Sequence, residues 1–300
     1  MSLLHRAPGN RRPATPWVVG VGRSGTTLLR LMLDTHPDLA IPAETHFVPA
    51  VIEAAKRGAG PDQLASLITD ARTWDDFGLD AALLGRRIAA LGTADAAAVL
   101  RCFYELYAEL QQKTRWGDKT PIYVKEMRTI GAVLGEARFI HLIRDGRDVA
   151  LSRRRRGMGA GKPIADTAQR WRGRIERARS QAKRLRGRYV ELRFEDLVAD
   201  PEPPLRRICE LIELEYDAAM LDYHHRAGER LAEMDTDLPP SEGRPQRGGA
   251  ERLASHALAT GPPRAERTEA WRTEMSDADR REFEAVAGGL LAELGYDVPS

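Results

Sequence analysis

The chain has 300 residues, of which 42% are hydrophobic and 30% are charged, and its 46 Lys and Arg residues nearly balance 44 Asp and Glu residues. This composition excludes a disordered chain, a collagen and a bundle of membrane helices, and the length is sufficient to bury a large core. The formal net charge of +2 provides no general affinity for nucleic acids or membranes, so only a local patch could supply one.

Residues 1–15 are polar and contain several Arg and Pro residues, so we expect a disordered tail. They lack the apolar region of a signal peptide, and no stretch of the chain reaches the roughly 20 apolar residues that a membrane helix requires. Cys102 and Cys209 lie far apart without a CxxC spacing, which predicts free buried thiols in a reducing compartment. We therefore expect a cytoplasmic protein.

Residues 16–300 are expected to form a single α/β domain. The run PWVVGVG at residues 16–22 is apolar and β-branched, which predicts a buried strand, and a glycine loop and a helical pattern follow it. The same order recurs at residues 139–143, where Asp145 opens the next helix, and at residues 188–197. Strands that alternate with helices in this way predict a parallel sheet covered by helices on both faces.

The stretches between and after these strands are predicted to be helical. Residues 47–115 form a helical insertion, and further helices are expected from about Ile122, over residues 164–188 and after Pro201. The chain ends in a helix that Ser276 can cap.

Residues 235–265 are rich in Pro, Gly and Ser and have little periodic apolar pattern. Such a composition is typical of a mobile loop or of a lid that orders over a site. We therefore interpret residues 217–263 as a mobile loop or lid.

The glycine loop at residues 20–27 has the GxxxxG spacing of a phosphate-binding P-loop. In such a loop, backbone N–H groups and the positive end of the following helix face a phosphate. Thr26 stands where a Walker A loop carries its lysine, and no apolar run ending in Asp offers a Walker B metal ligand, which leaves Arg23 as the available cation. These departures indicate a nucleotide other than ATP with Mg²⁺; the alternative is a turn that packs and binds nothing.

Arg144 directly follows the second predicted strand, so it should face the same crevice as the glycine loop. Arg144 and Ser152 can bind a second phosphate, whereas a structural salt bridge is the other interpretation of Arg144. Asp145 and Asp148 are expected to cap the following helix and to pair with Arg147.

The segments GVGRSGTTLL and LIRDGRDVALSRR, with AETHF and GDKTP between them, resemble the motifs of sulfotransferases that use 3′-phosphoadenosine 5′-phosphosulfate (PAPS). The branch that they resemble most includes tyrosylprotein sulfotransferases and many bacterial proteins. The resemblance covers residues 17–201 and returns in the C-terminal LGYDVP. The resemblance implies a P-loop α/β fold. It also implies that the Walker lysine is absent, as it is in this sequence.

By position, the resemblance implies that the glycine loop binds the 5′-phosphosulfate, while Arg144 and Ser152 bind the 3′-phosphate and Phe194 contacts the adenine. The loop residues concerned are Arg23, Ser24, Gly25, Thr26 and Thr27. Arg267, and less strongly Arg264, are candidates to fold over the nucleotide if the predicted lid closes.

The resemblance also implies Glu44 as the general base and Lys119 as the residue that stabilises the leaving oxygen, with help from Arg23. His46 stands where the branch carries an arginine, and it is the alternative base because histidine is the commoner general base. The predicted mechanism is in-line attack by an acceptor hydroxyl, in which Glu44 takes the proton, a role that suits a carboxylate whose pKa partial burial has raised. The structural alternatives are a solvated Glu44 and a Lys119 that pairs with Asp118.

The predicted activity is therefore transfer of the sulfuryl group of PAPS to a hydroxyl of a glycan, a small molecule or a peptide tyrosine, releasing adenosine 3′,5′-bisphosphate (PAP). We expect no metal, because the sequence has no cluster of ligands for one. A divergent P-loop kinase and a nucleotide-binding module without catalysis are the alternatives. Acceptor choice should depend on residues 47–115 and 217–263, and the oligomeric state cannot be inferred.

Basic residues are concentrated in one region of the chain. The run comprises residues 153–156 and is extended by Arg170, Arg172, Arg174 and Arg177. Few aromatic residues interleave with it, so we do not predict nucleic-acid binding. A solvated helical face is the main interpretation, and a patch that attracts an anionic acceptor is the alternative. His141, inside the second predicted strand, is interpreted as a core histidine.

Overall fold

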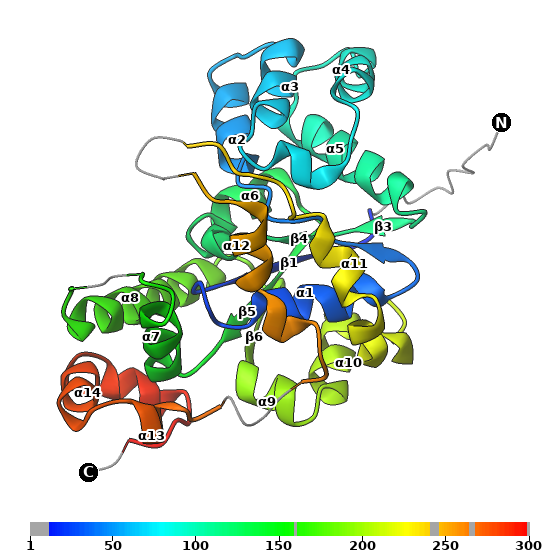
Figure 1. The fold of residues 1–300 in the computed structure, drawn as a ribbon. Helices are drawn as coiled ribbons and strands as arrows, with labels where there is room; N and C mark the ends of the chain where they lie inside the picture. The colour runs from blue at the N-terminus through cyan, green and yellow to red at the C-terminus, as the bar shows by residue number, and fades with distance from the viewer. Residues whose placement is uncertain (1–11, 159–160, 241–245, 264–267, 299–300) are drawn as a thin grey trace.

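A computed structural model of the chain describes residues 12–158, 161–240, 246–263 and 268–298 (Figure 1). At its centre lies a parallel sheet with the strand order β4–β1–β5–β6. The strands are β4 (Asp118–Lys119), β1 (Thr15–Gly20), β5 (Ala137–Ile143) and β6 (Tyr189–Arg193). The predicted α/β fold with a parallel sheet is therefore confirmed, and most of the predicted N-terminal tail lies outside the described residues.

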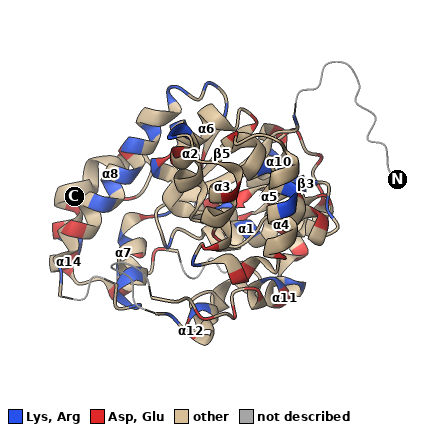
Figure 2. Cartoon of the chain, turned by 90° about the horizontal axis from the view of Figure 1, so that it is seen from above, with Lys and Arg blue, Asp and Glu red and all other residues tan. Residues whose placement is uncertain are grey.

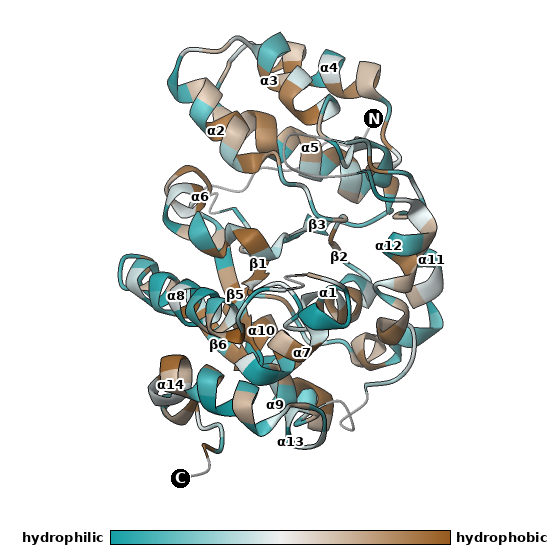
Figure 3. Cartoon of the chain, turned by 60° about the vertical axis from the view of Figure 1, so that its left-hand side comes forward, coloured by the Kyte–Doolittle hydropathy of each residue, from teal (hydrophilic) through white to brown (hydrophobic). Residues whose placement is uncertain are grey.

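β1 and β5 are buried along their whole length, as expected for central strands of a covered parallel sheet. Trp17 of β1 lies in register with Phe139 of β5, and Figure 3 shows β1 as hydrophobic. His141 is fully buried and its Nδ1 lies 2.7 Å from the hydroxyl of Tyr189, so it is a core histidine, as predicted. Cys102 and Cys209 are buried free thiols.

Helices follow the strands in the predicted order. These are α1 (Thr26–Thr35) after β1, α7 (Gly146–Arg154) and α8 (Ile164–Ala182) after β5, and α9 (Phe194–Ala199) and α10 (Glu202–Leu211) after β6. Asp145 caps α7 by accepting a hydrogen bond from the backbone N–H of Arg147 at 2.8 Å. Ser276 likewise caps the C-terminal α14 (Asp277–Glu293), which follows the short α13 (Trp271–Glu274).

Residues 47–115 contain four α-helices, which gather at the top of Figure 1. They are α2 (Val48–Lys56), α3 (Pro61–Thr69), α4 (Ala81–Ala90) and α5 (Ala96–Leu110), with a 3₁₀ helix η1 (Trp74–Phe77) between α3 and α4. Their centre contains an aromatic cluster in which Phe103 meets Phe47 and Phe77 edge-on, with ring centroids 4.9 and 5.1 Å apart.

Short elements connect this insertion to the sheet. β2 (Leu39–Ala40) and β3 (Arg115–Trp116) form a separate parallel pair, and η2 (Pro121–Lys125) and α6 (Met127–Val133) lead from β4 to β5. The helix predicted from Ile122 is thus split into a 3₁₀ turn and an α-helix. Within the described ranges, the helices are all too short or too polar to cross a membrane.

Between residues 235 and 265 the structure contains regular elements that the composition did not predict, while the alternative of a lid stays a prediction. This stretch contains α12 (Gly249–Ala254), η4 (Ala257–Ala259) and a bridge between Leu238 and Arg247. Before it, η3 (Ala218–His225) and α11 (Ala227–Ala232) also lie within residues 217–263. The described parts of this stretch, residues 217–240 and 246–263, contain regular elements that contact the body of the protein.

Polar anchors explain why this stretch is ordered without an apolar pattern. In the first anchor, the buried Arg252 of α12 pairs with the buried Asp76 of η1 and donates to the hydroxyl of Thr236 at 2.8 Å. We call these three residues the Arg252 anchor. Because its partners are 176 and 16 positions away from Arg252, no local periodicity reveals it.

The second anchor joins α11 to α1 and α5. Arg230 pairs with the buried Asp34, with 2.6 Å between Nε and Oδ2, and donates to the hydroxyl of Tyr107 at 2.6 Å. Arg30 donates to Glu233 at 2.8 Å in the same cluster. Truncating one partner of such a buried pair is costly, because the other charge is left buried and alone.

Candidate active site

A cavity of about 660 Å³ opens where β1 and β5 end, beside the glycine loop. Its wall comes from the loop, η2, α8, α9, the α12–η4 stretch and the residues that flank α7. The sequence-predicted residues that line it are Arg23, Gly25, Thr26, Thr27, Glu44, Arg144 and Phe194. The parallel sheet therefore places ligand-binding candidates where this fold class normally binds ligands.

The glycine loop is held in its turn by Gly25. Gly25 has φ 88°, in the left-handed region, and a Cβ atom there would lie 2.3 Å from the ring of Phe194. The ring of Phe194 therefore packs directly on the loop, and only glycine fits both requirements. Ser24 is fully buried, and its hydroxyl has no hydrogen-bond partner among the described residues.

Arg23 and Ser152 link the loop to α7, with 3.1 Å between the donating Nε and the hydroxyl oxygen. Arg144 lies over the ring of Phe194 at 4.8 Å and 3.6 Å from a carboxylate oxygen of Asp148. Burial, followed by the nearby arginines Arg156 and Arg144, lowers the pKa of Arg23. Such a gathering of guanidinium groups around a glycine loop is suited to a ligand with several phosphates.

The expected pairing of Asp148 with Arg147 is wrong. Arg147 pairs with Asp145 and with Glu284 of α14, both at 2.7 Å. Asp148 instead accepts backbone N–H groups of Glu269 and Trp271, at 2.9 and 3.0 Å, and so holds the start of α13. This contact lies just beyond Arg267 and Arg264, which are outside the described residues.

Glu44 lies between two cationic or potentially cationic groups. Its Oε1 accepts a hydrogen bond from Lys119 Nζ at 2.8 Å, and its Oε2 is 3.2 Å from His46 Nε2. Lys119 is only 1% exposed at the end of β4, and its Nζ is also 3.5 Å from the hydroxyl of Thr27. Lys119 thus connects Glu44 to the glycine loop.

Lys119 does not pair with the adjacent Asp118. Asp118 is buried and accepts hydrogen bonds from the hydroxyls of Thr45 and Tyr104, both at 2.8 Å. Burial raises the pKa of Asp118 to about 6, even though these hydrogen bonds oppose the shift. Its role is to hold the strand that carries Lys119.

The expectation of a raised pKa at Glu44 is wrong. Burial does raise its pKa, but the Lys119 ammonium and the hydrogen bond from His46 outweigh burial and leave it well below the usual range. The sequence predicted that Glu44, Lys119 and His46 belong to one site, but the distances between them decide the direction of the pKa shift, and the sequence does not contain those distances. At neutral pH the Glu44 side chain is an ionised carboxylate.

His256 was missed by the sequence interpretation. It follows α12, lines the cavity, and is half-buried. Burial, followed by the nearby Lys119 ammonium, lowers its pKa to about 3, so its imidazole is neutral. No sequence pattern pointed to it, because it lies in the stretch that has no periodic apolar residues.

The described residues contain no group of three or more His, Cys, Asp or Glu side chains that could hold a metal ion. The cavity, as far as it is described, is lined instead by five arginines and two glutamates. Its chemistry is that of a site for anionic ligands with one carboxylate beside the glycine loop.

Comparison with known proteins gives a consistent result. The model of the sulfotransferase family matches residues 17–218. The chain is 26% identical to a putative protein-tyrosine sulfotransferase of Caenorhabditis briggsae, over 95% of this chain and 89% of that protein. It is 25% identical to protein-tyrosine sulfotransferase 1 of Danio rerio, over 94% of this chain and 72% of that protein.

Solved structures agree with this assignment at the level of the fold. The sulfotransferase domain of the Synechococcus PCC 7002 olefin synthase has a TM-score of 0.56 and 22% identity, covering 98% of this chain and 99% of that one. The sulfotransferase domain from the curacin biosynthetic pathway has a TM-score of 0.57 and 20% identity, covering 97% and 100%. Because the family model matches about two thirds of its length, the chain belongs to the sulfotransferase family.

Proposed function

We propose that this protein transfers the sulfuryl group of PAPS to an acceptor hydroxyl, with Glu44 as the general base. The observation that carries the proposal is the chain of contacts from Glu44 through the buried Lys119 to Thr27, in which Glu44 and Thr27 line the same cavity. It places an ionised carboxylate and a buried ammonium beside a loop built for a phosphate.

The donor site is proposed from the loop and the arginines around it. The backbone of residues 23–27 and the start of α1 would hold the 5′-phosphate end. Arg144 and Ser152 would hold the 3′-phosphate, and Phe194, which packs on Gly25, would contact the adenine. The buried hydroxyl of Ser24, without a partner in the described part of the chain, supports a ligand at this loop. When bound, PAPS supplies the sulfuryl group, and PAP is the leaving group.

Glu44 and Lys119 have complementary roles in this proposal. Glu44 takes the proton of the acceptor hydroxyl as the oxygen attacks, and Lys119 and Arg23 stabilise the charge that grows on the phosphate side. His46 holds the second oxygen of Glu44 and so orients the carboxylate. The alternative is that His46 is the general base, and the variants Glu44→Gln and His46→Asn distinguish these two assignments.

The acceptor is proposed to be a phenol. A carboxylate with a lowered pKa is a weak base, so it serves an acidic hydroxyl better than an aliphatic alcohol. Phenols have a pKa of about 10, several units below that of an alcohol. The names of the two relatives, which are protein-tyrosine sulfotransferases, support the same chemistry.

Calorimetric titration with PAP, AMP and ATP with Mg²⁺ tests the donor. We expect PAP to bind and the other two to bind at least tenfold more weakly, because only PAP carries the 3′-phosphate that Arg144 would hold. Arg144→Ala should lose this preference. A preference for ATP with Mg²⁺ would instead support a P-loop kinase, the alternative interpretation.

A further inference from the structure

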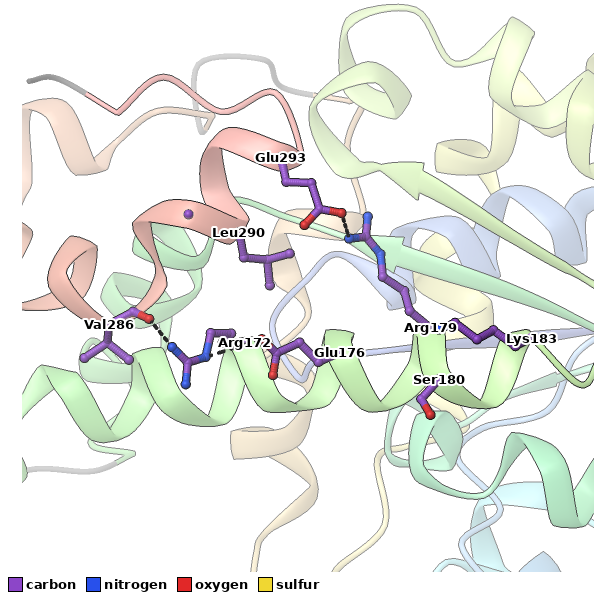
Figure 4. Close-up of a pocket in the computed structure, with 9 residues that line it drawn as sticks. Arg172, Glu176, Arg179, Ser180, Lys183, Val286, Leu290 and Glu293 are labelled. Carbon is purple, nitrogen blue, oxygen red and sulfur yellow. Dashed lines mark hydrogen bonds and ion pairs between the residues drawn. The ribbon is translucent and has the colours of Figure 1, made fainter.

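Many charged side chains are paired at the surface of the protein. Figure 2 shows basic residues along α8 and acidic residues on α14, which packs against it. One contact between these helices joins Arg179 to Glu293 at 2.6 Å (Figure 4). Asp118 differs from these groups, because it is fully buried and its neighbour Lys119 pairs with Glu44 instead. Burying a carboxylate without a cationic partner is costly unless hydrogen bonds hold it.

Hydroxyl groups surround the Asp118 carboxylate. Thr45 and Tyr104 donate hydrogen bonds to its Oδ2, both at 2.8 Å, and the hydroxyl of Tyr123 lies 2.9 Å from that of Thr45. The hydroxyl of Thr120 accepts a hydrogen bond from the backbone N–H of Thr45 at 3.0 Å. All five residues are at most 1% exposed. We call these five residues the Thr45 network.

The hydrogen bonds at the centre of the Thr45 network have a defined direction. The single proton of the Thr45 hydroxyl goes to the Asp118 carboxylate, so the hydroxyl of Tyr123 must donate to Thr45. Burial raises the pKa of Tyr123 well above its usual range, so this hydroxyl keeps its proton. Removal of the Thr45 hydroxyl would therefore leave Asp118 and Tyr123 each without one partner.

The Thr45 network joins the two segments that carry the proposed catalytic groups. Thr45 directly follows Glu44, and its partner Asp118 directly precedes Lys119. Successive side chains of a strand point to opposite sides, so Asp118 lies in the core while Lys119 reaches Glu44. Their strand, β4, has two residues and lies at the edge of the sheet. A strand this short has few backbone hydrogen bonds of its own, so the contact between Asp118 and Thr45 fixes its position beside Glu44.

The backbone on the other side of Thr45 is strained. His46 has φ 57°, in the left-handed region that residues other than glycine rarely adopt. The backbone N–H of Phe47 donates to the carbonyl of Thr45 at 2.7 Å and closes this turn, which brings His46 Nε2 to 3.2 Å from Glu44 Oε2. Such a conformation persists only where its surroundings hold it, and the buried contacts of Thr45 provide that support.

We propose that Thr45 and Asp118 are positioning residues, which hold the Glu44 carboxylate against the buried ammonium of β4 in the orientation that takes the proton of the acceptor. The proposal rests on the proposed function and adds the residues that orient its general base. Thr45 is fully buried, so it acts through Glu44 rather than on a substrate. Because a displacement of about 1 Å can lower a rate about 100-fold, loss of the network should reduce kcat much more than donor affinity.

Two substitutions of Thr45 distinguish a positioning role from a purely structural one. Thr45→Val removes the hydroxyl and keeps the branched shape, whereas Thr45→Ser keeps the hydroxyl. Thr15→Val is the matched control, because Thr15 is buried at the start of β1 and its hydroxyl accepts a hydrogen bond from Trp17 at 3.2 Å. Tyr123→Phe removes the donor to Thr45 and replaces Thr45→Val if that variant does not fold.

Urea denaturation gives the free energy of unfolding of each variant, and calorimetry gives its PAP affinity. Release of PAP from PAPS, with 2-naphthol or 6-hydroxynaphthalene-2-sulfonate as the acceptor, gives kcat and KM under conditions where the variant is fully folded. We expect Thr45→Val to lower kcat about tenfold or more while its PAP affinity stays within about twofold of native. Thr45→Ser and Thr15→Val should keep kcat within about threefold, and Tyr123→Phe should lower it as Thr45→Val does.

A kcat within about threefold of native in Thr45→Val, or in Tyr123→Phe where Thr45→Val does not fold, would overturn the proposal. A fall in Thr45→Ser or Thr15→Val as large as that in Thr45→Val would also overturn it, because the Thr45 hydroxyl would not be the cause. A parallel loss of PAP affinity would assign the network to the donor site, with the same consequence. If the native protein releases no PAP from PAPS with either phenol, the proposed function itself is refuted and this proposal with it.

Discussion

Replacing Glu44 with glutamine removes the proposed base while keeping its shape. The amide oxygen can still accept the hydrogen bond that Lys119 donates to Oε1 at 2.8 Å. Removing one partner of a buried ion pair costs about 3–5 kcal/mol, but Glu44 is 31% exposed and the hydrogen bond remains, so we expect a loss of about 1–2 kcal/mol. Proteins of this size commonly have about 5–15 kcal/mol of stability, so Glu44→Gln should stay folded.

The same substitution should nearly abolish turnover. General-base catalysis contributes about 10²–10⁴-fold, and we expect kcat to fall within that range. PAP affinity should change little, because Glu44 lies beside the loop rather than in it. The assay is release of PAP from PAPS with 2-naphthol or 6-hydroxynaphthalene-2-sulfonate as the acceptor, with urea denaturation as the stability control.

His46→Asn provides the matched comparison. His46 contacts the other carboxylate oxygen at 3.2 Å, so its loss should cost far less than the loss of Glu44 if it only orients the base. The reasoning about Glu44 is refuted if Glu44→Gln keeps more than about a tenth of the native kcat while His46→Asn loses the larger share.

Three further predictions follow from the same contacts. Because the pKa of Glu44 is lowered, the fall of kcat/KM on the acid side should lie below about pH 5, and kcat/KM should show no such fall between about pH 5 and 8. His46→Asn removes one cause of the lowering, so in a pH–rate profile the fall on the acid side should move to higher pH. Gly25→Ala should weaken PAP binding at least tenfold in a calorimetric titration, because its Cβ would collide with the ring of Phe194; affinity within twofold of native would contradict this. Arg252→Ala should lower the free energy of unfolding by about 3–5 kcal/mol in urea, because it leaves the buried Asp76 carboxylate without its positive partner, and a loss below about 1 kcal/mol would show that the anchor contributes little.

Local sequence patterns were sufficient to predict the fold and the residues proposed to bind the sulfuryl donor. The apolar run before Gly20 and the one before Arg144 predicted β1 and β5, and the rule that ligands bind at strand ends joined their loops in one crevice. β4 was missed because a strand of two residues has no periodicity. Yet this short strand presents Lys119 to Glu44.

The composition of residues 217–263 left open whether they form a mobile loop or a lid, and it did not reveal what would order them. Their order depends on contacts such as Arg252 with Asp76, which pair charges from distant parts of the chain. A composition of Pro, Gly and Ser predicts disorder when burial of apolar groups is the only stabilisation considered. His256 enters the site only because those polar contacts fold the stretch that carries it.

The Arg252 anchor also limits how this protein could acquire a new acceptor. The anchor joins the α12–η4 stretch, which carries His256, to η1 in the helical insertion. The position of this stretch at the cavity therefore depends on the helical insertion. A chimera that exchanged only one of them with a relative would separate Arg252 from Asp76 and bury an unmatched charge. In this protein, a new acceptor specificity should therefore require the helical insertion and the α12–η4 stretch to change together, and engineering should transplant both.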